Sequence, residues 1–273
     1  MQEAQSFSLA DQELHPSQTP APTVILKDRL RSFIFYRKPW YYICMEKRKV
    51  AVFDIDGTVF RWSLFLDLVD KLIENGVFPK ETRDAYETER TCWLDRKGDY
   101  RTFVEKAVAV FGEQLKGVRY EDAADAAGEV VEAKKDRVYR YTRDLIKKLK
   151  SEGYFLLAIS HSPKFIADGF GYEAGFDKTY GYFYETGPND RFTGRVEDEA
   201  LIANKANILE RAVRKEELTY EGSIGVGDTE SDITMLEAVE TPIAFNPNRK
   251  LYDHAKRRGW KVVVERKDVI YEL

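Results

Sequence analysis

Residues 50–58 read VAVFDIDGT, and this stretch decides the fold. Four apolar residues in a short run, two of them β-branched, predict a buried strand. The run stops at Asp54, and Gly57 permits the tight turn that follows. Open α/β sheets bind their ligands beyond the carboxyl ends of the strands. The polar residues 54–58 are therefore the first candidate site.

Four further apolar runs follow downstream, separated by amphipathic helical stretches. The predicted strands cover residues 154–159, 223–226, 242–245 and 261–264. The predicted helices cover residues 138–150, 202–214, 231–239 and 248–258. Residues 179–195 alternate aromatic side chains around the turn GPND, which is typical of a β-hairpin. Strands that alternate with helices indicate an α/β fold with a parallel sheet and right-handed crossovers.

The first two core strands are separated by about a hundred residues that contain no convincing strand. A helix is predicted over residues 64–73, where leucines recur at a spacing of four. A crossover needs only a minority of this segment, so the rest is predicted to be an inserted helical domain. We expect this cap at residues 61–137, with the core formed by residues 50–60 and 138–273.

Composition excludes several classes of protein. The chain has 273 residues, 43% hydrophobic and 33% charged, which is typical of a folded globular protein. No apolar run approaches the ~18 residues of a membrane span. A net charge of −4 argues against a chain-wide nucleic-acid footprint. Two cysteines are too few for a disulfide scaffold and favour a reduced, cytoplasmic setting.

The N-terminal region has two parts. Residues 1–29 are polar and are predicted to form a mobile tail without a secretory signal. Residues 30–49 form a strap in which aromatic and basic side chains alternate, within a segment, 27–49, that holds eight Lys/Arg against two acids. Such a strap either packs its aromatics on the domain or makes weak contact with a membrane surface or an acidic partner.

A group of polar residues lies at or just beyond the predicted strand ends and helix starts. It comprises Asp54, Asp56, Ser160, Lys205, Asp228 and Asp232. Clustered carboxylates repel one another unless a cation neutralises them, and an all-oxygen ligand set favours Mg²⁺ over zinc. A hydroxyl and a lysine beside them suit a phosphate group, and Thr58 is a further candidate phosphate ligand. This combination indicates phosphoryl transfer to an aspartate nucleophile.

With these motifs in order, the sequence resembles the haloacid dehalogenase superfamily of phosphatases, in its phosphoserine-phosphatase-like branch. The resemblance rests on DIDGT, Ser160, Lys205, GDTESD and the helical insert after the first motif, and it covers roughly residues 50–265. It implies a Rossmann-like core with a mobile helical cap. It also implies Mg²⁺-dependent hydrolysis of a small phosphorylated metabolite through an aspartyl-phosphate.

The resemblance assigns a role to each motif residue. Asp54 is the implied nucleophile and Asp56 the general acid and base, while Ser160 and Lys205 bind phosphate. The implied metal ligands are Asp54, the backbone carbonyl of Asp56, and Asp228. Asp232 and Gly57 support the metal site without binding the ion directly.

The cap departs from true phosphoserine phosphatases. Those enzymes carry a glutamate seven residues after the second motif aspartate, and this chain has Ser63 there, preceded by Arg61 and Trp62. These three are the candidate substrate contacts of the cap. Three alternatives stay open: a phosphotransferase or phosphomutase on the same scaffold, a true phosphoserine phosphatase, and a binding or scaffold protein with a decayed site. The oligomeric state is not predicted.

Overall fold

The computed structural model describes residues 46–197 and 204–273. Its strands are β1 (Lys49–Phe53), β2 (Phe155–Pro163), β3 (Lys178–Thr186), β4 (Phe192–Glu197), β5 (Thr219–Gly227), β6 (Thr241–Phe245), β7 (Lys261–Arg266) and β8 (Val269–Glu272). Its α-helices are α1 (Leu64–Glu74), α2 (Glu87–Leu94), α3 (Tyr100–Leu115), α4 (Tyr120–Lys134), α5 (Arg140–Ser151), α6 (Lys164–Ala174), α8 (Lys205–Lys215), α9 (Ile233–Glu237) and α10 (Arg249–Arg258). Short 3₁₀ turns are η1 (Lys80–Tyr86), η2 (Pro188–Asp190) and η3 (Glu230–Asp232).

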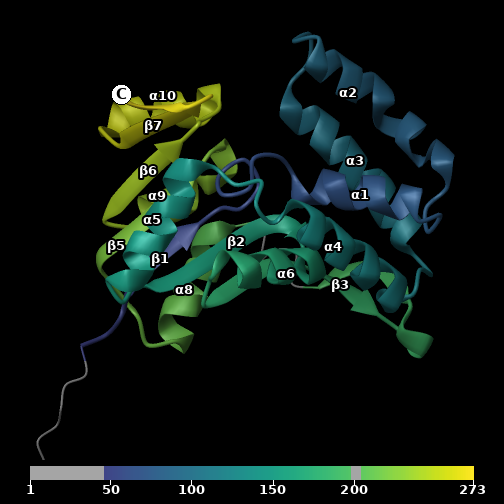
Figure 1. Cartoon of the computed structure of the whole chain (residues 1–273), viewed down its shortest axis with the longest axis horizontal. Coiled ribbons are helices and arrows are strands. Elements are labelled where there is room, and N and C mark those ends of the chain that lie inside the picture. Colours follow the sequence, from purple (N-terminus) through teal and green to yellow (C-terminus); the bar gives the residue numbers. More distant parts are fainter. Residues whose placement is uncertain (1–45, 198–203) are drawn as a thin grey trace, which may run out of the picture. The chain divides into compact units, whose positions relative to one another are not determined.

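The strands form one sheet in the order β4-β3-β2-β1-β5-β6-β7-β8 (Figure 1). Pairing is parallel from β3 to β7, and the two outer strands, β4 and β8, are antiparallel to their neighbours. Strand β1 lies between β2 and β5, with Phe53 opposite both Ala158 and Val226. The carboxyl ends of these three strands therefore meet at one edge, and the predicted α/β fold class is confirmed.

Alternation along β1 shows why both faces of the sheet are covered. Val50 and Val52 pack with α8, α9 and α10, whereas Ala51 and Phe53 belong to a larger core that includes α5 and α6. All four side chains are buried. A strand with period-two geometry that is apolar at every position needs helices on both sides, as parallel sheets have.

The helices that follow the first motif pack on the same core. Phe65 of α1 meets Phe111 of α3 edge to face, with ring centroids 5.3 Å apart. Figure 1 shows α1 and α4 side by side, and α4 also contacts α6. The chain passes between the sheet and this helical segment twice, once before α1 and once after α4. The Arg61 N–H of the first connection donates to the Arg137 carbonyl of the second at 2.9 Å. We call this region, 58–63 with 135–139, the hinge.

Residues Met45–Leu273 form a single compact unit. The division into a core and a cap over residues 61–137 stays a prediction, and we keep the name cap for that segment. No helix in the described ranges is long and apolar enough to cross a membrane. The tail over 1–29 and most of the strap over 30–49 lie outside the described residues. At the end of the strap, Arg48 donates to the Tyr154 carbonyl at 2.7 Å and lies over the Phe155 ring.

Two elements were not predicted from sequence. Helix α6 contains Gly169 and Gly171, which lower helix propensity and hide its pattern. Strand β8 follows β7 after a two-residue turn and pairs with it at the sheet edge. Both depend on contacts with other parts of the chain. The predicted helix over 202–214 begins at Lys205 in the described residues, since 198–203 lie outside them.

Candidate active site

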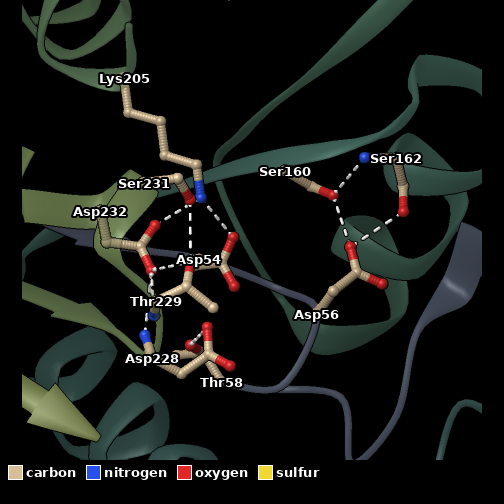
Figure 2. Close-up of polar contacts among 10 residues, drawn as sticks. All are labelled: Asp54, Asp56, Thr58, Ser160, Ser162, Lys205, Asp228, Thr229, Ser231 and Asp232. Atoms are coloured by element: carbon tan, nitrogen blue, oxygen red, sulfur yellow. Dashed lines mark hydrogen bonds and ion pairs between the residues drawn. The ribbon is translucent and has the colours of Figure 1, made fainter. Parts of the chain in front are cut away.

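The ends of β1 and β5 and the start of α8 bring three charged side chains together. Asp54 follows β1 directly, Asp232 lies in η3 after β5, and Lys205 is the first residue of α8. The Lys205 ammonium donates to Asp54 Oδ1 at 2.5 Å and to Asp232 Oδ1 at 2.6 Å (Figure 2). All three residues are buried, and Lys205 is only 1% exposed. A buried ammonium between two carboxylates compensates charges that would otherwise be very costly to bury.

The position of Lys205 follows from its helix terminus. Asn204 caps α8, because its side-chain oxygen accepts the Ala206 N–H at 3.0 Å. Ile208, Leu209 and Ala212 anchor the same helix on the sheet face that Val50 and Val52 form. The lysine stem is therefore held by packing while its head reaches the strand ends. Burial alone lowers the pKa of Lys205, but the two carboxylates outweigh burial and raise it, so the side chain is a cation.

The loop after β5 is organised by Asp232. Its Oδ2 accepts the backbone N–H groups of Asp228 and Thr229, each at 3.0 Å. One Asp232 oxygen therefore accepts hydrogen bonds from the loop, and the other accepts from Lys205. Gly227 is required here, because a Cβ at that position would lie 2.5 Å from the Cβ of Asp232. The arrangement turns the Asp228 carboxylate toward the DIDGT loop, where the Thr58 hydroxyl donates to it at 3.4 Å.

Asp54, Asp228 and Asp232 form an acidic cluster in which one oxygen from each lies within 4.8 Å of the others. Burial, followed by the opposing effect of Lys205 and the repulsion of nearby carboxylates, brings the pKa of Asp54 to about 7. Burial and the neighbouring Asp54 also raise the pKa of Asp228 well above its ordinary value. The cluster therefore contains more carboxyl groups than Lys205 alone can neutralise, and burial favours their protonated forms unless a further cation is present.

This donor set fits a hard divalent cation. It consists of carboxylate oxygens, with no histidine or thiol in the cluster among the described residues. Both Asp232 oxygens already accept hydrogen bonds from the loop and from Lys205, so Asp54 and Asp228 have more coordinating capacity left. Gly57 leaves room beside Asp228: a Cβ there would lie 2.1 Å from its Oδ2, and the Gly57 φ of +82° favours glycine.

Asp56 lies only two residues from Asp54 but has different surroundings (Figure 2). Its Oδ2 accepts the hydroxyls of Ser160 at 2.7 Å and Ser162 at 2.8 Å. Its Oδ1 accepts the Leu64 N–H at 2.5 Å, at the start of α1. Burial raises the pKa of Asp56, while these hydrogen bonds oppose the shift. Burial therefore lets Asp56 hold a proton more readily than an exposed aspartate does.

Ser162 was missed in the sequence analysis, although a signal was present. Ser160 and Ser162 are two residues apart on β2 and therefore point to the same face. His161 between them has its ring 5.7 Å from that of Tyr182. The Ser162 N–H also donates to the Ser160 Oγ at 2.8 Å, which orients that hydroxyl. Because side chains alternate between the two faces of a strand, a site hydroxyl at Ser160 implies a second one at Ser162.

The candidate cap residues occupy two different places. Ser63 is buried and caps α1, where its hydroxyl accepts the Leu66 N–H at 3.4 Å. Arg61 and Trp62 instead line a cavity of about 660 Å³ at the hinge, together with Arg137. The sequence analysis also missed Tyr100, whose hydroxyl interacts with Ser63 and whose pKa is raised by burial and by Asp56. Phosphate binding by Ser160, Lys205 and Thr58 stays a prediction.

Comparison with known proteins identifies the family of this chain. Residues 51–237 match the family of haloacid dehalogenase-like hydrolases. The chain belongs to this family. The match includes Asp54, Asp56, Ser160, Lys205, Asp228 and Asp232, the residues of the site described above. The resemblance stated from the motifs is therefore confirmed.

Individual relatives are more distant. A phosphoserine phosphatase of Archaeoglobus fulgidus is 29% identical over 80% of this chain, but the chain spans only 58% of that relative. A histidinol-phosphatase of Neisseria meningitidis is 26% identical over 79% of this chain and 98% of its own length. A solved phosphoserine phosphatase with a phospho-aspartyl intermediate analogue has a TM-score of 0.54 and 22% identity, covering 82% of this chain and 96% of its own. That structural likeness supports the fold alone.

Proposed function

We propose that this protein is a Mg²⁺-dependent phosphomonoesterase that forms an aspartyl-phosphate on Asp54 and acts on a small phosphorylated metabolite. The observation that supports this proposal most strongly is the contrast between the surroundings of two neighbouring carboxylates. Asp54 lies against the Lys205 ammonium at 2.5 Å, whereas Asp56 lies against two serine hydroxyls and a helix N-terminus. This contrast supports Asp54 as the nucleophile beside a cation and Asp56 as the proton carrier.

In the first step, a carboxylate oxygen of Asp54 attacks the phosphorus atom. A bond forms between them, and the bond from phosphorus to the ester oxygen breaks. Asp56 gives its proton to the departing oxygen, so the alcohol leaves neutral. Ser160 lies 2.7 Å from Asp56, so a phosphate held by the Ser160 hydroxyl lies beside this proton donor. The Lys205 ammonium offsets negative charge on the phosphate and on Asp54.

In the second step, the deprotonated Asp56 takes a proton from water. The water oxygen attacks the phosphorus, and the bond from phosphorus to Asp54 breaks. Inorganic phosphate leaves, Asp54 returns as a carboxylate, and Asp56 is protonated again. The raised pKa of Asp56 suits this alternation, because burial makes the protonated form more accessible than it is in an exposed aspartate.

Asp54 and Asp228 would hold the ion, with Asp232 orienting the Asp228 loop and the Asp56 carbonyl as a further proposed ligand. When bound, Mg²⁺ neutralises charge on these carboxylates and on the phosphate, which lowers the repulsion between nucleophile and substrate. The raised pKa values of Asp54 and Asp228 support a cation at this position.

The test combines product analysis with labelling of the chain. Purified protein with Mg²⁺ is assayed for phosphate release from phosphoserine, histidinol phosphate, and sugar, nucleotide and headgroup phosphates. We expect release from at least one of them without an added acceptor. A radiolabelled substrate quenched in acid should leave label on the peptide that contains Asp54. Asp54→Asn should remain unlabelled, whereas Asp84→Asn, a change at an exposed aspartate of the cap, should label normally.

Two outcomes would favour the alternatives. Label that leaves the chain only when an alcohol or sugar acceptor is added would indicate a phosphotransferase or phosphomutase. No release and no label with any substrate, at any Mg²⁺ concentration, would indicate a binding or scaffold protein. A strong preference for phosphoserine would identify a true phosphoserine phosphatase in spite of Ser63.

A further inference from the structure

We propose that Tyr100 and the aromatic side chains behind it form the surface that receives the leaving group, and that they select a flat, uncharged ring. This inference rests on the proposed phosphomonoesterase activity and names the substrate class. The expected substrate is a phosphomonoester of an aromatic or heteroaromatic alcohol, not of an amine-bearing one.

Tyr100 reaches the reacting groups from the cap. It is the first residue of α3, and the next residue, Arg101, has its Nη1 4.0 Å from the Glu230 carboxylate in the GDTESD loop. The start of α3 therefore lies against the same loop that presents Asp228. The Tyr100 hydroxyl interacts with Ser63. Leu64, the residue after Ser63, donates its N–H to Asp56 at 2.5 Å. These contacts place the Tyr100 ring beside the proton donor for the leaving oxygen.

A row of aromatic rings continues away from Tyr100. The Trp93 ring centroid lies 5.2 Å from that of Tyr100 and 5.7 Å from that of Trp62. Phe103 supports the row from within the cap, with its centroid 6.1 Å from Tyr100 and 5.9 Å from Trp93. Phe103 is buried, Tyr100 and Trp93 are half-buried, and Trp62 is 41% exposed. The row therefore has ring surface left to contact a ligand.

Two acidic side chains of the cap near this row are paired with basic residues. Glu105, five residues after Tyr100 on α3, accepts the Arg101 Nε–H at 2.6 Å. Asp67 on α1 pairs with Lys134 at 2.7 Å and lines the hinge cavity. Ser63 offers an amine only a hydroxyl that is already in contact with Tyr100. A substrate ammonium would lose its water without gaining a carboxylate, and this loss disfavours an amine-bearing leaving group.

The experiment compares three alkyl phosphates whose leaving groups differ in shape and charge: benzyl phosphate, ethyl phosphate and phosphoethanolamine. Benzyl and ethyl alcohols are both poor leaving groups, so the comparison reports mainly binding of the ring. We expect kcat/KM for benzyl phosphate to exceed that for ethyl phosphate by about tenfold, equivalent to ~1.4 kcal/mol. Phosphoethanolamine should give no higher a value than ethyl phosphate.

Substitutions at Tyr100 then test the ring directly. Tyr100→Phe keeps the ring and should retain the benzyl preference within about twofold, whereas Tyr100→Leu and Tyr100→Ala should reduce the benzyl-to-ethyl ratio to near one. Tyr172→Ala, which removes a tyrosine that is 82% exposed on α6, should leave the ratio unchanged. Thermal melting identifies any variant that fails to fold. If Tyr100→Ala does not fold, the comparison of Tyr100→Phe and Tyr100→Leu still tests the ring.

The outcomes separate this inference from the function on which it rests. Phosphate release with no benzyl preference, or a preference that Tyr100→Leu leaves intact, would overturn the aromatic subsite while the phosphatase assignment stands. A Tyr100→Phe variant that behaves like Tyr100→Leu would also overturn it, since the hydroxyl and not the ring would then matter. No release from any phosphate, with no labelling of Asp54, would overturn the proposed function itself.

Discussion

The sheet edge and the cap face meet at the site, but they are built from opposite kinds of interaction. At the sheet edge, Lys205 lies between Asp54 and Asp232, all three buried, and the contacts are between full charges. On the cap face, Tyr100 and Trp93 offer ring surface, and the ion pair of Arg101 with Glu105 is exposed on the same helix as Tyr100. The first region holds the groups that we propose react, and the second holds the ring surface that we propose binds the leaving group.

The difference separates reaction type from substrate choice. A buried charge cluster tolerates little change, because removing one partner leaves the others uncompensated in a low-dielectric setting. Replacing one apolar contact by another on an aromatic surface changes the free energy much less. We therefore expect substitutions at the sheet edge to abolish activity with every substrate, and substitutions on the cap face to change the ranking of substrates.

The largest effect should come from Asp54→Asn. An amide is a poor nucleophile, so kcat should fall by at least about a thousandfold with every substrate, or ~4 kcal/mol in barrier terms. The measurement is steady-state phosphate release, with Asp84→Asn as the matched control at an exposed cap position. If Asp54→Asn kept more than about a tenth of the activity, the nucleophile would have to be another residue.

Asp56→Asn should cost less and should depend on the leaving group. General acid catalysis contributes about 10²–10⁴-fold, and it matters most when the departing oxygen is strongly basic. We expect a drop of that size for ethyl phosphate and a clearly smaller drop for 4-nitrophenyl phosphate. Equal losses for both substrates would argue that Asp56 orients the loop and transfers no proton.

Mg²⁺ should stabilise the fold through the acidic cluster. At about 100 times its Kd, a ligand that binds only the folded state adds ~2.7 kcal/mol, which for a chain of this size raises Tm by about 5–10 °C. Asp228→Asn should abolish that rise, because it removes a proposed ligand. A Tm increase that persists in Asp228→Asn would place the ion elsewhere.

Without divalent cations, the pKa of Asp54 predicts how stability depends on pH. The ordinary value of 3.8 becomes about 7 in the folded chain, so between these values the folded state binds more protons than the unfolded one. The free energy of unfolding should therefore fall as pH rises through this window and should level off above it. We expect this slope to be weaker in Asp54→Asn, measured by urea melts at several pH values with chelator. The same slope in both proteins would contradict the assignment to Asp54.

The smallest effect should come from the exposed ion pair of the cap. Glu105→Gln removes the partner of Arg101, and surface pairs contribute little because water and salt screen them. Tm should change by less than about 2 °C, and kcat with ethyl phosphate should be unaffected. A large loss of activity would show that Glu105 contacts substrate and would weaken the contrast between the two regions.

Much of the sheet edge was predictable because strand ends follow a local rule. The apolar runs before Asp54, Ser160 and Asp228 predict parallel strands, and their carboxyl ends must meet at one edge. That reasoning placed the reactive carboxylates together without any knowledge of contacts. It also predicts helices between the first two core strands, where no strand pattern occurs, and α1 to α5 lie there.

The tertiary structure alone decided which group each residue faces. Asp54 and Asp56 look equivalent in DIDGT, and only the packing of α8 and β2 gives one a lysine and the other two hydroxyls. Thr58, a candidate phosphate ligand in the sequence, has its hydroxyl on Asp228. Helix α6 and strand β8 likewise depend on packing and strand pairing that no local sequence pattern predicts.

The cap shows the limit of local reasoning most clearly. Arg61 and Trp62 follow the motif directly in sequence and line the hinge cavity, whereas Tyr100 reaches the site from a helix that begins 44 positions after Asp56. A periodic pattern reports which face of a helix is apolar, because neighbouring turns share that face. It carries no information on where the helix start lies relative to a distant loop. The sequence thus determined the fold class and which polar side chains gather at the sheet edge, and long-range packing determined what lies opposite them.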